Sequence, residues 1–200
     1  DAERLIPKYP GTSPGLVFQQ GALAFRKGDY PLAQSLFREA ARRASEKTAE
    51  SALFNENLAA LNANDAAGAA ALVKEAAGSA QLREHILFEQ AHYAAKRMNP
   101  QAPELLASFV ALATDPALKT QARLDQAEVA LNLNPPDLET VQAVLPPLEK
   151  EQLTPEQTMQ LARLNILEAE SRQEWPSAIQ ACRQAIALDS EGKQADMLYL

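Results

Sequence analysis

The stretch that decides the fold runs from residue 21 to residue 40 and reads GALAFRKGDYPLAQSLFREA. Both halves have helical composition, but the turn-forming residues of KGDYP (27–31) interrupt them. The small residues Gly21 and Ala24 precede the break, and the apolar residues Phe37 and Ala40 follow it. This order is typical of two short helices that are joined by a tight turn and approach closely through small side chains.

The bulk composition narrows the class of protein. The chain has 200 residues, of which 46% are hydrophobic, and its net charge is −7. This length corresponds to one ordinary domain or to an array of small units. The acidic balance argues against binding to nucleic acid or to an anionic membrane surface, and no apolar stretch has membrane-spanning length. The single cysteine, Cys182, excludes a disulfide within the chain and leaves the redox compartment open.

Proline positions predict where helices begin. Four dipeptides place a helix-capping residue before a proline, which suits the first helical position: Ser13-Pro14, Asp115-Pro116, Asn134-Pro135 and Thr154-Pro155. We therefore expect prolines at helix starts and not inside helices, and Gln157 adds a capping box to Thr154. No strand is expected, and helices are expected at 14–27, 30–46, 48–63, 65–77, 80–98, 102–114, 116–132, 136–149, 155–173, 175–188 and 191–200.

These helices form a repeat. In the first helix of each pair, a column of mostly small residues contains Gly21, Asn57, Ala91, Ala127 and Ile166, at steps of 36, 34, 36 and 39 residues. Three residues later a second column contains alanine five times, at 24, 60, 94, 130 and 169. The second helices carry apolar residues at i, i+3, i+4 and i+7, as in Ala33, Leu36, Phe37 and Ala40. No single pair can bury such a face alone, so the pairs are expected to stack.

This pattern resembles the tetratricopeptide repeat (TPR) family, whose unit of about 34 residues is a helix–turn–helix with small residues where the helices cross. Residues 14–47 and the stretch EWPSAIQACRQAIALD (174–189) match best. The resemblance implies an all-α, right-handed superhelical solenoid of antiparallel helix pairs. Five hairpins are expected at 14–47, 48–79, 80–114, 115–153 and 154–190, with the end of a preceding repeat at 1–12 and the first helix of a further repeat at 191–200.

One column departs from the family pattern. Just before the small column the family usually has a large apolar residue, whereas this chain has Gln20, Glu56, Gln90, Gln126 and Asn165. One interpretation is a solvated stripe or a changed helix rotation. The other is a polar ladder that ties adjacent repeats together or lines a groove.

In the family, first helices form the inner surface where ligands usually lie. Mapping that surface onto this chain gives partner-binding candidates at Phe18, Phe25, Arg26, Phe54, Leu61, Asn62, Phe88, His92, Lys96 and Asn132. Phe18, Phe54 and Phe88 share one register position, where exposed aromatic side chains would suit an apolar peptide or helix. The alternative is that these three phenylalanines are ordinary core.

Other conspicuous residues are expected to be structural. His85 and His92 are two helical turns apart, which is too far for one metal ion. Cys182 lies in an apolar stripe and is expected as buried filler, and Tyr30 and Trp175 are expected to wedge equivalent turns. The chain has no motif of a known catalytic or nucleotide-binding site, so no enzyme activity, cofactor or metal is expected.

The sequence therefore favours a non-catalytic scaffold that binds a protein or peptide in a concave groove. The alternatives are a regulatory or substrate-holding segment of a larger enzyme, and a homo-oligomer assembled through the solenoid ends. IPKYPGTSP (6–14) is similar to helix ends in bacterial cell-envelope repeat proteins, such as lipoproteins of outer-membrane assembly and the periplasmic partner of the Tol–Pal system. This similarity favours a bacterial envelope or periplasmic location over the cytoplasm, and the chain ends suggest a fragment of a larger protein.

Overall fold

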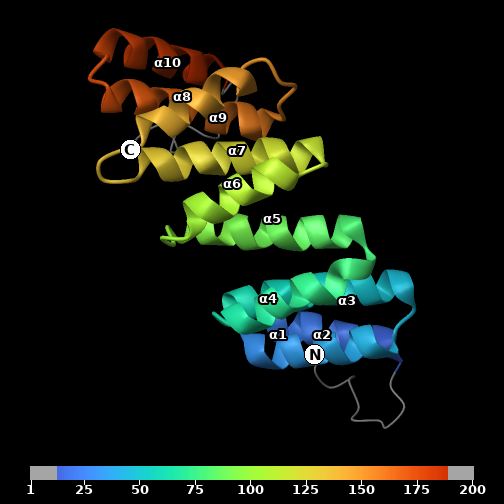
Figure 1. Cartoon of the computed structure of the whole chain (residues 1–200). Helices are drawn as coiled ribbons and strands as arrows, with labels where there is room; N and C mark the ends of the chain where they lie inside the picture. Colours follow the sequence, from blue (N-terminus) through green and yellow to red (C-terminus); the bar gives the residue numbers. More distant parts are fainter. Residues whose placement is uncertain (1–12, 189–200) are drawn as a thin grey trace. The chain divides into compact units, whose positions relative to one another are not determined.

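The computed structural model describes residues 13–188, and in this range the chain is helical without any strand (Figure 1). Each helix lies within three residues of its expected bounds; the expected elements at 1–12 and 191–200 lie outside the described residues. The helices are α1 (Pro14–Arg26), α2 (Tyr30–Arg43), α3 (Glu46–Asn62), α4 (Ala66–Glu75), the 3-10 turn η2 (Ala76–Gly78), α5 (Ala80–Lys96), α6 (Ala102–Leu112), α7 (Pro116–Leu131), α8 (Leu138–Leu148), α9 (Pro155–Ser171) and α10 (Trp175–Leu188).

Three of the four expected proline-linked caps are confirmed. The side chains of Ser13, Asp115 and Thr154 accept hydrogen bonds from backbone N–H groups in the first turns of α1, α7 and α9. At Thr154 the capping box is complete, because the Gln157 side chain accepts from the Thr154 N–H at 3.1 Å. These bonds satisfy backbone donors that a helix start otherwise leaves unpaired.

The fourth expected cap is wrong. The Asn134–Pro135 peptide bond is cis and lies in the loop before α8, and the helix begins at Leu138. Asp137 caps it instead: its Oδ1 accepts from the Thr140 N–H at 3.1 Å, and its Oδ2 accepts from the Thr140 hydroxyl at 2.6 Å. The bonds from Thr140 lower the pKa of the Asp137 carboxyl below its ordinary value.

The expectation that prolines avoid helix interiors is also wrong. Pro146 and Pro147 lie inside the last turn of α8. Each removes a backbone N–H from the helix, and α8 ends one residue later, at Leu148. Burial of the apolar face of α8 therefore outweighs the helix-breaking effect of these two prolines over the last turn.

Consecutive helices pack against one another within two compact units, residues 1–90 and 91–200, and the boundary between them falls inside α5. In the first unit α1 packs on α2, α2 on α3, and α3 on α4. In the second unit α6 packs on α7, α7 on α8 and α9, and α9 on α10. All five alanines of the second repeat column are buried, which confirms that they lie where helices meet.

The opening stretch forms the first hairpin. Gly28 adopts φ = 79°, a left-handed conformation that glycine tolerates best, and Asp29 caps α2 by accepting from the Leu32 N–H. A β-carbon added at Gly21 would stand 2.9 Å from the Phe37 ring. Glycine therefore lets this fully buried ring lie directly on the α1 backbone.

The second unit has a larger aliphatic core. Leu124 and Leu131 of α7, Leu145 of α8 and Leu164 of α9 belong to one buried cluster. Leu124 thus belongs to the core. Leucine is the main residue of this cluster, whereas alanine and phenylalanine form the buried cluster of the first hairpin.

The polar column is not a solvated stripe in the first unit. Glu56 is 0% exposed, and its Oε1 accepts from the Arg38 Nε of α2 at 2.7 Å. The Gln90 Nε2 of α5 donates to the Asn57 side chain at 2.9 Å and to the Ala69 carbonyl at 2.8 Å. These bonds tie a first helix to both helices of the preceding pair, as the ladder interpretation requires.

Two expected structural roles need correction. Trp175 is exposed and does not wedge its turn, whereas Tyr30 lies edge-on to Phe25 with ring centroids 5.3 Å apart. Cys182 is half-buried rather than enclosed.

Candidate functional site

In the second unit, three first helices present polar side chains to one another; we call these residues the polar face. His92 and Lys96 lie one turn apart at the end of α5, and Asp125 and Glu128 lie one turn apart on α7. The remaining members of the polar face are Gln121 of α7 and Gln157, Gln160 and Arg163 of α9. Spacings of three and four residues put each set on one side of its helix.

Asp125 of α7 connects the polar face to the end of α5. Its side chain is buried, its Oδ2 lies 2.5 Å from the His92 Nδ1, and its Oδ1 accepts from the Gln121 Nε2 at 3.1 Å. A buried carboxylate is tolerated only when such partners compensate its desolvation. Asp125 therefore fixes the orientation of the His92 ring.

Glu128 lies between two cations. Its Oε2 accepts from the Lys96 Nζ at 3.3 Å and from the Gln160 Nε2 at 3.2 Å, and its Oε1 is 4.0 Å from the Arg163 Nη1. Lys96 is more than half exposed, so its pairing with Glu128 is weak and open to competition. A ligand group can thus exchange with these contacts at low cost.

Glutamine side chains join α7 to α9. The Gln121 Nε2 donates to the Gln160 Oε1 at 3.0 Å, and the Gln157 Nε2 donates to the Gln121 Oε1 at 3.4 Å. These amides hold the side chains of neighbouring helices in register. The polar face is therefore ordered before any ligand arrives, which lowers the entropic cost of binding.

A hollow of about 210 Å³ opens at the end of this face. Asn132, the C-cap of α7, lies at its edge and donates from Nδ2 to the Glu128 carbonyl at 2.7 Å. The lining residues are Ala95, Lys96, Met98, Asp125, Glu128, Val129, Asn132 and Arg163. Two cations, two carboxylates and an amide therefore surround an open hollow, where they can form hydrogen bonds with polar groups of a ligand.

The structure thus brings together three of the sequence-predicted site residues, namely His92, Lys96 and Asn132. Sequence analysis missed Asp125, Glu128 and the glutamines. The repeat period could have identified the two carboxylates, because Asp125 follows His92 by 33 residues and Glu128 follows Lys96 by 32. Equivalent first-helix positions one repeat apart are natural contacts.

The predicted aromatic candidates of the first unit mostly serve packing. Phe88 is buried, in agreement with the core alternative, and Phe18 is half-buried with its ring edge-on to Phe37 at 5.3 Å. Phe25 packs against Tyr30 and the same core. Phe54 lines a hollow of about 300 Å³, which it shares with His85.

The other three candidates of the first unit are separate from that hollow. Arg26 is exposed in the last turn of α1, and Leu61 is half-buried near the end of α3. Asn62 is half-buried and donates to the Leu58 carbonyl of its own helix at 2.8 Å. The structure does not bring these residues together as one site.

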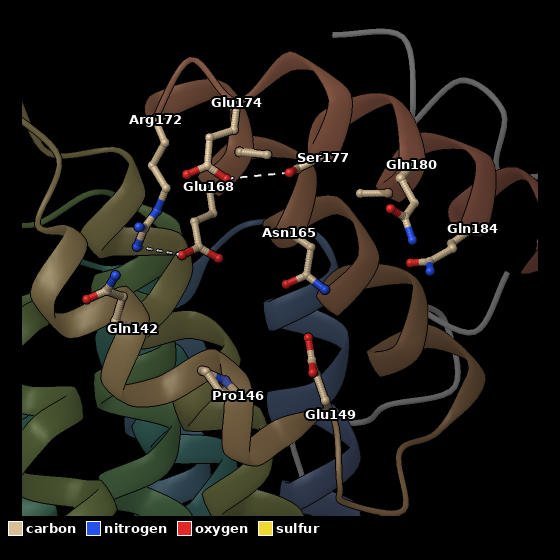
Figure 2. A pocket seen from close by; sticks show the side chains of 12 residues that line it. Gln142, Pro146, Glu149, Asn165, Glu168, Arg172, Glu174, Ser177, Gln180 and Gln184 are labelled. Atoms are coloured by element: carbon tan, nitrogen blue, oxygen red, sulfur yellow. Dashed lines mark hydrogen bonds and ion pairs between the residues drawn. The ribbon is translucent and has the colours of Figure 1, made fainter.

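A second hollow in the second unit, of about 450 Å³, lies among α8, α9 and α10 (Figure 2). Figure 2 shows Glu149 and Asn165 pointing toward each other across it. Arg172 pairs with Glu168 at 2.9 Å; with the Gln142 amide oxygen turned toward it, the guanidinium also donates to Gln142 at 2.9 Å. With three carboxylates to one cation in its lining, this hollow favours a positively charged group.

Within residues 13–188, no group of three or more His, Cys, Asp or Glu side chains is placed to hold a metal ion. None of the described helices has both the length and the apolar character needed to span a bilayer.

Comparison of the chain with protein-family models, with curated proteins and with solved structures found no match.

Proposed function

We propose that this protein is a TPR-like, non-catalytic interaction scaffold that binds an extended segment of a protein partner on the polar face of α5, α7 and α9. The observation that carries this proposal is the set of cross-helix bonds centred on Glu128, which leaves Lys96 and Arg163 at the edge of a hollow. In this proposal the helix pairs stack as a right-handed solenoid.

The partner segment is expected to carry a carboxylate. Lys96 and Arg163 already hold one carboxylate, that of Glu128, through long contacts of 3.3 and 4.0 Å. A second carboxylate approaching from solvent would form shorter, charge-assisted bonds with the same cations. Backbone N–H groups of the partner would then replace the cations at Glu128.

Selection of peptides from a random displayed library on the immobilised 200-residue chain tests this proposal. We expect acidic peptides whose affinity falls at least tenfold in the double variant Lys96→Ala/Arg163→Ala, because each lost charge-assisted bond contributes about 1.5–3 kcal/mol. Lys150→Ala is the matched control, since Lys150 is an exposed cation of the same unit outside the polar face.

Two outcomes would contradict the proposal. One is that the selected peptides bind the double variant as tightly as the parent chain. The other is that they lose affinity in Phe54→Ala instead, which would move the site to the hollow of the first unit. Far-UV circular dichroism of each variant confirms that the helices remain intact.

A further inference from the structure

The hollow of about 450 Å³ among α8, α9 and α10 has an equivalent place in the first unit, among α2, α3 and α4. The repeat register relates the two places. Buried residues that occupy the same register position on the three helices are Phe37 and Leu145, Ala60 and Ala169, and Ala69 and Ala178. Each side chain that lines the hollow can therefore be compared with its counterpart in the first unit.

In the first unit, an arginine occupies this place. The Arg38 guanidinium of α2 bonds to the buried carboxylate of Glu56 on α3, with the Arg38 Nε 2.7 Å from the Glu56 Oε1. Gln34, one turn earlier on α2, donates to the Asp65 Oδ2 at the start of α4 at 2.9 Å. An arginine and a glutamine of α2 thus join the next helix pair through carboxylates.

The second unit lacks that arginine. Pro146 stands at the register position of Arg38, and Asn165 stands at that of Glu56; both line the hollow. The proline ring has no donor that could bond to an acceptor on α9. The place that a guanidinium occupies in the first unit is therefore an open hollow in the second (Figure 2).

Acceptors remain around the open hollow. Glu149, at the end of α8, points across it toward Asn165 (Figure 2). Glu168 is neutralised by Arg172 at 2.9 Å, whereas Glu149 and Glu174 pair with no cation among the described residues. The lining therefore keeps two carboxylates whose charge is uncompensated, beside the amide oxygen of Asn165.

A guanidinium group matches these acceptors. It presents five N–H donors in a planar fork, so one edge can bond both oxygens of the Glu149 carboxylate while the other edge reaches the Asn165 amide oxygen. The volume of the hollow, about 450 Å³, lies within the range of about 300–1,000 Å³ that is usual for ligand pockets. Charge, donor geometry and size thus agree.

We propose that this hollow binds the guanidinium group of an arginine side chain from a peptide segment of another protein, in the place that Arg38 occupies in the first unit. A peptide suits the hollow because its open side lets the chain that carries the guanidinium continue into solvent. The hollow shares no residue with the polar face, so either proposal can fail alone. Binding of a single arginine is expected to be weak, with a dissociation constant of about 0.1–1 mM.

Titration of the full 200-residue chain with the peptide acetyl-Gly-Gly-Arg-Gly-Gly-amide, followed by two-dimensional proton–nitrogen NMR, tests the proposal. The side-chain amide signals of Asn165 and Gln184, which line the hollow, should move as the peptide binds. The same peptide with citrulline in place of arginine has nearly the same shape without the charge. We expect it to bind at least tenfold more weakly, because the charge-assisted bonds are lost.

A charge variant tests the assigned carboxylate. Glu149→Gln should weaken binding of the arginine peptide at least tenfold, because it removes the carboxylate that faces Asn165. Glu139→Gln is the matched control: Glu139 is an exposed carboxylate of the same helix outside the hollow, so its replacement should leave the affinity unchanged.

A second pair of variants tests the comparison with the first unit. Pro146→Arg places an arginine of the chain itself at the position of Arg38, so its guanidinium should occupy the acceptors and reduce peptide affinity at least tenfold. Pro146→Ala removes the same proline without supplying a guanidinium and should still bind the peptide. Far-UV circular dichroism checks that both variants keep their helices.

Four results would each refute the proposal. Equal affinity for the citrulline peptide would show that the charge is not recognised, and equal affinity of Pro146→Arg and Pro146→Ala would place the peptide elsewhere. Ethylguanidinium binding as tightly as the peptide would indicate a site for a small free cation. If Lys193→Ala, which removes the one cation of residues 189–200, moves the Asn165 signal in the free chain, the chain supplies its own cation.

Discussion

At the scale of single residues, Glu56 is the most constrained side chain in the first unit. It is fully buried, and only one of its oxygens, Oε1, meets the Arg38 guanidinium, while Oε2 has no hydrogen-bond partner. Burial raises the pKa of the Glu56 carboxyl above its ordinary value of 4.5, and the charge and hydrogen bond of Arg38 oppose that shift. The polar ladder therefore has a free-energy cost that depends on pH.

The pH dependence has a definite sign. Since the pKa is raised in the folded state, that state binds the Glu56 proton more tightly than the unfolded state does. The stabilisation is complete below pH 4.5 and is lost as the pH rises from 4.5 through the folded pKa. Arg42 and the neighbouring Glu75 adjust this window in opposite directions.

Glu56→Gln removes this titration and keeps an oxygen that can accept from Arg38. We expect the free energy of unfolding of the parent chain, relative to that of Glu56→Gln, to fall as the pH rises from 4.5 toward neutrality. Urea unfolding of both proteins at a series of pH values measures the difference, in which other titrating groups cancel. A difference that is constant or rises with pH would contradict this prediction.

At the scale of helices, the contact between α1 and α2 depends on one missing side chain. Gly21 is buried beneath the Phe37 ring, whereas Gly15 of the same helix has no neighbouring atom within 4 Å of the position of a β-carbon. Alanine is favoured over glycine in a helix by roughly 1 kcal/mol at either position. The two sites thus separate helix propensity from packing.

Gly15→Ala should therefore stabilise the protein slightly, by up to about 0.5–1 kcal/mol. Gly21→Ala should be less stable than Gly15→Ala by about 1–3 kcal/mol, because the new methyl group would displace the Phe37 ring in a well-packed core. Thermal unfolding of the two variants provides the comparison. Equal stabilisation by both would show that the Phe37 ring can move aside freely.

At the scale of the whole molecule, stability is expected to be local. The two units each have their own buried clusters, which in the first unit centre on Phe37 and Leu72 and in the second on Leu145 and Leu164. Helical repeats gain most of their stability from nearest neighbours. Damage in one unit should therefore weaken that unit first.

Phe37→Ala tests this expectation, because the loss of a buried phenyl ring costs about 3–5 kcal/mol. Hydrogen exchange followed by mass spectrometry should show faster exchange in α1 and α2 and unchanged exchange in α9 and α10. Leu164→Ala should give the reverse pattern. Equal acceleration throughout the chain in either variant would instead indicate a single cooperative unit.

Much of the helical structure could be predicted from the sequence because its signals are local. Caps such as Thr154 act within three residues, and the alanine column repeats at intervals that place each alanine where two helices meet. The local signal at Asn134 gave the wrong helix start, because a second capping residue lies nearby: Asp137 rather than Asn134 caps α8. Pro146 and Pro147 lie inside α8, contrary to the prediction that prolines avoid helix interiors. The packing of α8 on α7 compensates for the backbone hydrogen bonds that these prolines remove.

The sequence by itself therefore determined the helix bounds, the pairing of neighbours and the positions of close approach. Only the tertiary structure decided which side chains face outward: Phe88 and Glu56 became buried, the polar face formed around Glu128, and Ile179 stayed exposed. The reason is physical. Helix formation depends on residues within about four positions, whereas burial depends on how each helix is rotated against partners about 30 or more residues away.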